Sequence, residues 1–96
     1  MQFEWDEGKN QANVEKHGVD FETASRIFEG AILTDNDRRQ DYGEVREVSI
    51  GKIEEIVTLV VVHTDRNGAT RLISARLASR EERRRYEQAL REAVDR

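Results

Sequence analysis

The sequence of 96 residues contains no cysteine and no proline. Without cysteine there is no disulfide bond, thiolate nucleophile or cysteine-ligated zinc, and two histidines are too few for an all-histidine metal site. Long hydrophobic runs are also missing, since the longest, from Ile56 to Val62, is about a third of a membrane span. No signal-peptide pattern opens the chain. We therefore expect a cytoplasmic protein with no metal, no cofactor and no membrane contact.

Charge is distributed unevenly along the chain, whose formal net charge is −4. Residues 1–48 hold six Lys and Arg against twelve Asp and Glu, whereas residues 49–96 hold ten against eight. Arginine outnumbers lysine 13 to 3, and its planar guanidinium suits phosphates and carboxylates. The acidic total thus conceals an arginine-rich segment between His63 and Arg85, although a solvated, salt-bridged surface is the simpler explanation for any single arginine.

No linker or repeat interrupts the sequence, so we expect residues 1–96 to form a single domain. Apolar periodicity and capping residues predict a short strand at residues 3–5, helices at 6–17 and 20–29, strands at 31–34, 44–50, 56–62 and 70–77, and a C-terminal helix after residue 79. We expect a loop at 35–43, a turn at 51–52 and a hairpin turn at 65–68. The predicted fold is α+β, with helices against an antiparallel sheet of three to four strands.

The C-terminal helix has the clearest start signal, a capping box with Ser79 at the N-cap and Glu82 as the third helical residue. The apolar stripe that should face the core consists of Tyr86, Ala89, Leu90, Ala93 and Val94. On the preceding strand, simple alternation places Leu72, Ser74 and Arg76 on one face of the sheet. The opposite face would then receive Arg71, Ile73, Ala75 and Leu77.

The first predicted helix carries Lys9, Asn13 and His17 at intervals of four residues, with Lys16 beside His17. A phosphate backbone could lie along this stripe. Histidine gives and takes a proton near neutral pH, so His17 is a candidate for acid–base chemistry. The alternative is a solvent-exposed helix face on which His17 only interacts with the helix dipole.

A second group of candidates lies in the arginine-rich segment, with Arg66 in the hairpin turn, Arg71 and Arg76 on the last strand, and Arg80 at the start of the last helix. Arg76 is the strongest of these, because an ordered strand aims it and the nearby helix N-terminus favours anions. A structural salt bridge from Arg76 to Glu82, or to an acidic residue of the first half of the chain, is the alternative. Two other side chains are more readily explained by packing, those of His63 and Tyr86.

The sequence contains three motifs in a characteristic order and spacing. They are Phe3-Glu4-Trp5-Asp6 with Lys9, then Lys16-His17-Gly18-Val19, and then the run ISARLASREE over residues 73–82. Together they resemble the BrnT toxins over about the whole chain. Two features depart from that family's pattern: His63 stands where many relatives carry tyrosine, and the net acidity is unusual for a protein that holds RNA.

The resemblance implies a RelE-like fold and a metal-independent ribonuclease toxin of a type II toxin–antitoxin system. A BrnA-like antitoxin with a ribbon-helix-helix part would silence it, and operator DNA would be bound only through the complex. Residues and resemblance together predict a catalytic set formed by His17, Arg66, Arg76 and Glu82. The predicted RNA phosphate ligands are Lys9, Asn13, Lys16, Arg80 and Arg83. Auxiliary roles fall to His63 and Tyr86.

The sequence leaves two main functions open. The first is RNA cleavage by transfer of the 2′-hydroxyl onto the neighbouring phosphate. The acid or base would be His17, His63 or Glu82, and the phosphate would be held and stabilised by Lys9, Arg66 and Arg76. The second is a non-enzymatic partner and co-repressor whose acidic first half binds a basic segment of a DNA-binding antitoxin. A plain α+β domain with scattered surface arginines is the third possibility.

Overall fold

A computed structural model describes residues 1–37 and 43–94 of the chain. The elements are β1 (Phe3–Glu4), α1 (Glu7–His17), α2 (Phe21–Ala24), the 3₁₀ helix η1 (Ser25–Glu29), β2 (Ile32–Asn36), β3 (Glu47–Ile53), β4 (Val57–Arg66), β5 (Ala69–Leu77) and α3 (Arg80–Val94). They build a five-stranded sheet in the order β1-β5-β4-β3-β2. The predicted α+β fold is confirmed: β2 to β5 are the antiparallel strands, and β1 adds a parallel strand beside β5.

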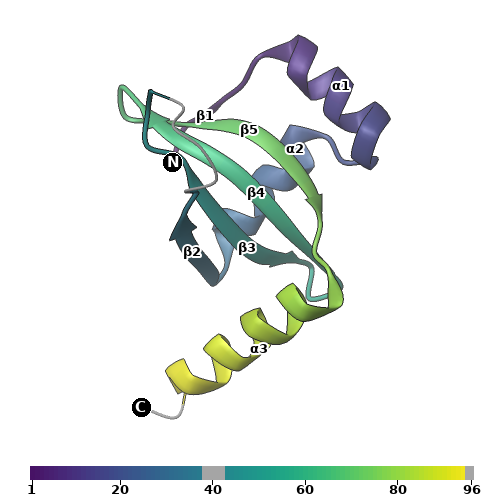
Figure 1. Ribbon diagram of the computed structural model, residues 1–96, viewed down its shortest axis with the longest axis vertical. Coiled ribbons are helices and arrows are strands. Elements are labelled where there is room, and N and C mark those ends of the chain that lie inside the picture. The colour runs from purple at the N-terminus through teal and green to yellow at the C-terminus, as the bar shows by residue number, and fades with distance from the viewer. Residues whose placement is uncertain (38–42, 95–96) are drawn as a thin grey trace.

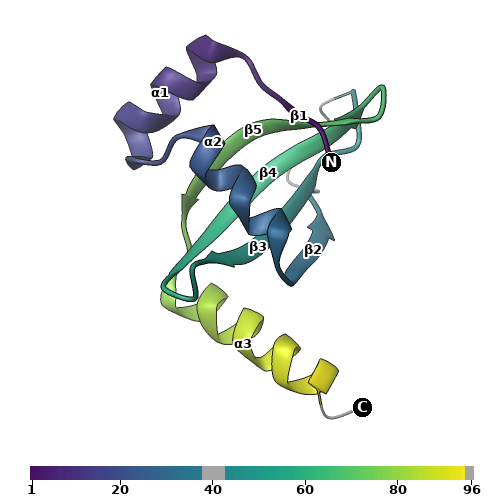
Figure 2. The ribbon, with the colours of Figure 1, turned by 180° about the vertical axis from the view of Figure 1, so that it is seen from behind.

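The first two helices begin where the capping residues predicted. The Asp6 carboxylate accepts a hydrogen bond from the Lys9 backbone N–H at 3.0 Å, and Gly18 ends α1 in the left-handed conformation at φ 72°. Asp20 caps α2 in the same way, with Thr23 as the donor at 2.7 Å. The second predicted helix does extend to residue 29, but its second half is the 3₁₀ helix η1. Figure 2 shows α2 and the segment after it lying across one face of the sheet.

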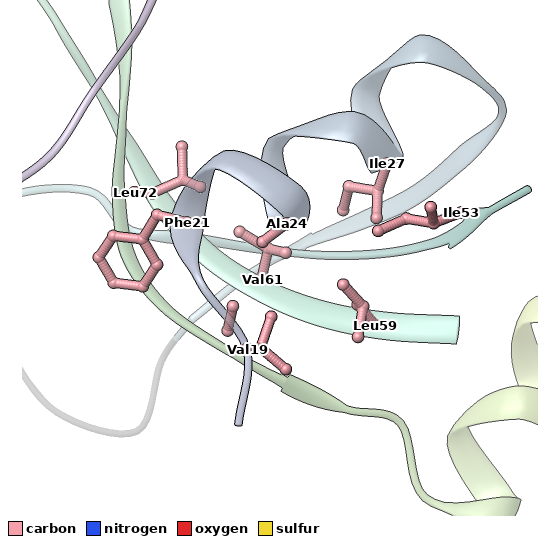
Figure 3. Close-up of a cluster of buried hydrophobic side chains, with 9 residues drawn as sticks. Val19, Phe21, Ala24, Ile27, Ile53, Leu59, Val61 and Leu72 are labelled. Atoms are coloured by element: carbon pink, nitrogen blue, oxygen red, sulfur yellow. The ribbon is translucent and has the colours of Figure 1, made fainter. Parts of the chain in front are cut away.

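The main core lies between that face of the sheet and the segment formed by α2 and η1 (Figure 3). Phe21, Ala24 and Ile27 project from α2 and η1 and are fully buried. The sheet contributes the remaining buried partners, which include Ile53, Leu59, Val61, Leu72 and Ala75. Burying this apolar surface is the chief source of stability for the fold.

The structure corrects the predicted turn at Gly51-Lys52, because β3 continues through it to Ile53. A Cβ at Gly51 would lie 2.8 Å from the Cβ of Ile27, so the glycine permits close packing of η1 on the sheet. The turn follows instead at Glu54 and Glu55, which adopt φ of 54° and 60°. β2 also extends to Asn36, beyond its predicted end, and most of the predicted loop at 35–43 lies outside the described residues.

The other face of the sheet is partly covered by α3, which crosses one end of the sheet (Figure 1). A small second cluster forms there from Ile50, Val60, Ala78 and Tyr86. The predicted capping box of α3 is present, since Glu82 N–H donates to the Ser79 hydroxyl and Ser79 N–H donates to Glu82. The apolar stripe is buried only in its first turns: Tyr86 is 3% exposed, whereas Val94 is 82% exposed. The prediction that the whole stripe faces the core was therefore wrong.

Candidate functional site

The sheet face that α3 leaves uncovered forms a cleft of about 540 Å³. Its floor consists of side chains in two rows that run across the strands. One row is Leu33, Ile50, Val60 and Arg76, and the other is Asp35, Val48, Val62 and Ser74. The middle of each row is apolar, and the polar residues stand at the edges.

A β-bulge between β4 and β5 decides which residues of β5 face this cleft. Val62 pairs with Ser74, but His63 pairs with Leu72, so Ile73 is an extra residue on β5. As a result Leu72 and Ala75 both enter the main core, while Ser74 and Arg76 line the cleft. The predicted grouping of Leu72 with Ser74 and Arg76 was wrong, because simple alternation does not hold across a bulge.

Arg76 is held at the cleft by a bidentate ion pair with Glu82 of α3. Both terminal guanidinium nitrogens donate to the two carboxylate oxygens at 2.8 Å. Glu82 also accepts from the Ser79 backbone N–H at 2.8 Å, so the capping box fixes the carboxylate that fixes the arginine. The Arg76 hydrogen bonds, more than those from Ser79, lower the pKa of Glu82 from 4.5 to about 2. Glu82 therefore stays ionised at neutral pH and orients Arg76.

The C-terminal turn of α1 brings two further predicted site residues to the cleft, Lys16 and His17. The left-handed Gly18 ends the helix immediately after them, so both side chains stand at its last turn beside β5. Arg85 of α3 lines the same cleft and was not among the predicted site residues. The sequence could have indicated Arg85 through its distance from Glu82, because a residue three positions later lies on the same side of a helix.

Other predicted site residues lie elsewhere on the molecule. Arg66 is in the β4–β5 hairpin, at the end of β5 opposite Arg76, and its nearest described acid is Glu44 at 3.7 Å. Lys9 is exposed in the first turn of α1. The exposed residues Arg80 and Arg83 belong to α3 but not to the cleft lining.

Asn13 is part of the interior rather than of a cationic stripe, and it is 7% exposed. Its amide nitrogen donates to the backbone oxygens of Val19 and Ala75, each at 2.8 Å. Its amide oxygen accepts from the Ala75 N–H at 3.1 Å. Asn13 thus bonds to the edge of β5 as a neighbouring strand would, and it joins α1 to the sheet.

The two auxiliary candidates are packed inside the protein. His63 is 6% exposed on the helix-covered face, where its Nε2 lies 2.7 Å from the Ser49 hydroxyl and its ring meets Phe28 edge-on at 5.0 Å. Burial lowers the pKa of His63. The Tyr86 hydroxyl donates to the backbone oxygen of Ala31 at 2.7 Å, and burial raises its pKa. Neither side chain lines the cleft.

The described residues 1–37 and 43–94 contain no group of three side chains able to hold a metal ion. No helix within the same ranges is long and apolar enough to cross a membrane.

Comparison with known proteins shows the family to which the chain belongs. A family model described as the ribonuclease toxin BrnT of a type II toxin–antitoxin system matches residues 5–82. The chain belongs to the BrnT family. Its fold is similar to the crystal structure of the Brucella abortus ribonuclease toxin BrnT, with 28% sequence identity, a TM-score of 0.63 and coverage of 83% of this chain and 99% of that chain. The comparison with curated proteins gave no match.

The resemblance predicted from the motifs is therefore confirmed, and the chain is a BrnT ribonuclease toxin of a type II toxin–antitoxin system. Membership of this family implies an antitoxin partner. The matched segment ends at Glu82, so it includes both Arg76 and the carboxylate that holds it.

Proposed function

We propose that this BrnT protein cleaves RNA in the cleft between α1, α3 and the open face of the sheet. The observation that carries the proposal is the Arg76 guanidinium, which Glu82 holds with two 2.8 Å hydrogen bonds on the wall of a cleft. Lys16 and Arg85 line the same cleft and add positive charge for a phosphate backbone, and His17 lies beside Lys16 in that lining. A net charge of −4 is compatible with this, because the cations that meet RNA are gathered locally.

The reaction is attack of a ribose 2′-oxygen on the adjacent phosphorus. His17 accepts the 2′-hydroxyl proton, the new O–P bond forms a 2′,3′-cyclic phosphate, and the 5′-oxygen leaves and takes a proton from water. Arg76 donates hydrogen bonds to the phosphoryl oxygens, whose negative charge grows in the transition state. Lys16 and Arg85 hold the neighbouring phosphates.

Two other predicted acid–base groups are less suited to this role. Glu82 has a pKa of about 2, so its carboxylate is a weak base, and both of its oxygens already accept hydrogen bonds from Arg76. His63 is buried on the opposite face of the sheet, against Phe28. His17 is therefore the acid–base group of the proposal, and the reaction proceeds on side chains without a metal ion.

The test is cleavage of purified, antitoxin-free RNA in the presence of EDTA, with the products identified by mass spectrometry. We expect fragments with 2′,3′-cyclic phosphate ends, and a rate reduced about 100-fold or more in both His17→Ala and Arg76→Ala. Arg84→Ala is the matched control, because Arg84 is exposed on α3 and does not line the cleft. Intact RNA at protein excess, or full activity in both cleft variants, would refute the proposal.

We also propose a BrnA-like ribbon-helix-helix antitoxin as the partner, with DNA binding confined to the complex. The family supports an antitoxin, and the acidic first half of the chain suits a basic segment of that partner. The non-enzymatic alternative rests on the same excess of acidic residues in the first half of the chain. Expression of the chain without antitoxin separates the two functions, since a ribonuclease should arrest growth and a pure partner module should not.

A further inference from the structure

The edge of the cleft opposite Arg76 is acidic, and the cleavage chemistry does not use it. β2 and the residue after it contribute three side chains to this edge: Asp35, Asn36 and Asp37. Asp35 lies in one row with Val48, Val62 and Ser74, so three strand spacings, about 14 Å, separate it from β5. The cationic edge of the cleft at Arg76 therefore faces the carboxylates of the acidic edge across an apolar floor.

Asp35 has a carboxylate available for a ligand. The residue is exposed, and its Oδ1 accepts from the Asn36 backbone N–H at 2.8 Å. Each carboxylate oxygen has two lone pairs, so this one contact leaves acceptor capacity on both oxygens. An ionised carboxylate accepts hydrogen bonds and donates none.

This chemistry discriminates among RNA bases. Proteins read unstacked bases through their Watson–Crick edges, and a carboxylate pairs with N–H donors there. Guanine presents two adjacent donors, N1–H and the 2-amino group, which match the two oxygens of a carboxylate. Adenine and cytosine present a single amino group next to an acceptor nitrogen, and uracil presents one N–H between two carbonyl oxygens.

We propose that Asp35 selects the base of the bound nucleotide and favours guanine. This inference rests on the proposed function, because it assumes that RNA occupies the cleft. The phosphate lies at the cationic side with Arg76, and the base extends over Val62 and Val48 toward Asp35. Repulsion between the carboxylate and phosphate disfavours the reversed orientation, so the two charged edges fix the direction of the nucleotide.

The experiment measures equilibrium binding of 2′-fluoro oligoribonucleotides, which lack the attacking hydroxyl and stay intact. Five pentamers carry guanosine, inosine, adenosine, cytidine or uridine at the centre, and uridine at every other position. We expect the guanine ligand to bind about tenfold more tightly than the all-uracil ligand. Inosine, which lacks the 2-amino group, should fall between them. Asp35→Asn should reduce the guanine preference to about twofold, because only one of the two polar atoms of an amide, its oxygen, can accept from the two guanine donors.

Asp65→Asn is the matched control, since Asp65 is also an exposed strand aspartate but lies outside the cleft. It should keep the full guanine preference. Equal affinity of the unmutated protein for all five ligands, or an unchanged preference in Asp35→Asn, would overturn the inference. It is also overturned if Asp35→Asn weakens antitoxin binding and leaves base preference intact, because this edge would then be a protein-docking surface. Ribonuclease activity is measured separately on unmodified RNA, so a failure of the proposed function is distinguishable.

Discussion

Asn13 offers a direct test of how the N-terminal helix is joined to the sheet. Replacing it with alanine removes three hydrogen bonds and leaves the N–H and C=O of Ala75 and the C=O of Val19 without their side-chain partner. An unsatisfied buried polar group costs about 1–3 kcal/mol, and water will reach some of these groups once the side chain is gone. We therefore expect Asn13→Ala to lower the free energy of unfolding by about 3–5 kcal/mol, a large part of the roughly 5–15 kcal/mol of a small domain.

Urea unfolding followed by the fluorescence of Trp5 measures this loss, because the single tryptophan packs edge-on against Phe21 with ring centroids 6.1 Å apart. With a slope of about 1.5 kcal/mol per molar urea, the midpoint should fall by about 2 M or more. Gln11→Ala, an exposed change on the same helix, should alter stability by less than about 0.5 kcal/mol.

The reasoning is refuted if Asn13→Ala loses less than about 1 kcal/mol of stability. It is refuted equally if the variant keeps its stability but binds RNA more weakly, since Asn13 would then be the phosphate ligand that its helical spacing suggested. Asn13→Asp should be at least as unstable as Asn13→Ala at neutral pH, because an ionised carboxylate donates no hydrogen bond and would be buried.

Three further changes test other contacts. Gly51→Ala should destabilise the fold by about 1–3 kcal/mol, because the new methyl group would meet Ile27 at 2.8 Å. Burial depresses the pKa of His63 in the folded state. The contribution of neutral His63 to stability should therefore be full above about pH 6.5 and fall at lower pH. His63→Phe should remove this loss of stability at lower pH. The Glu82 pKa is lowered to about 2, so its stabilisation is full above about pH 4.5 and is lost toward pH 2; Glu82→Gln should remove that acid-dependent part and lower stability at neutral pH by about 1–2 kcal/mol.

Urea unfolding at several pH values checks all three. An unchanged midpoint in Gly51→Ala would show that η1 shifts freely away from β3. An identical decline in stability from pH 7 to pH 5 in His63→Phe and the unmutated protein would show that His63 is not the titrating group. For Glu82→Gln, wild-type stability at neutral pH would mean that the Arg76 ion pair does not contribute, because glutamine can still accept the Ser79 N–H of the capping box.

The parts of the fold that sequence predicted well depend on local chemistry. Asp6, Asp20 and the Ser79–Glu82 pair cap helices through bonds that span only three residues, so their spacing is visible in the sequence. The bulge at Ile73 and the close approach at Gly51 depend on contacts with distant segments. Alternation and glycine statistics carry no information about such contacts, and the faces of β5 and the end of β3 were mispredicted as a result.

The site was predicted in part for the same reason. Arg76 and His17 stood out because a strand and a helix end aim them, and the ion pair of Arg76 with Glu82 was foreseen as an alternative to a functional role. Arg85 and Asp35 were missed, because their place in the cleft follows from how α3 and β2 lie on the sheet. The structural and the functional hypotheses for Arg76 are compatible, because the ion pair with Glu82 holds Arg76 in place at the cleft.

The central claim is that the Arg76 guanidinium, held by Glu82, stabilises the transition state of RNA cleavage. The most direct measurement is the single-turnover cleavage rate of Arg76→Lys, together with its affinity for uncleavable RNA. Lysine keeps the charge but loses the planar, two-pronged donor geometry. We predict an affinity within about threefold of the unmutated protein and a cleavage rate lower by about 100-fold. Cleavage at the unmutated rate would contradict the claim.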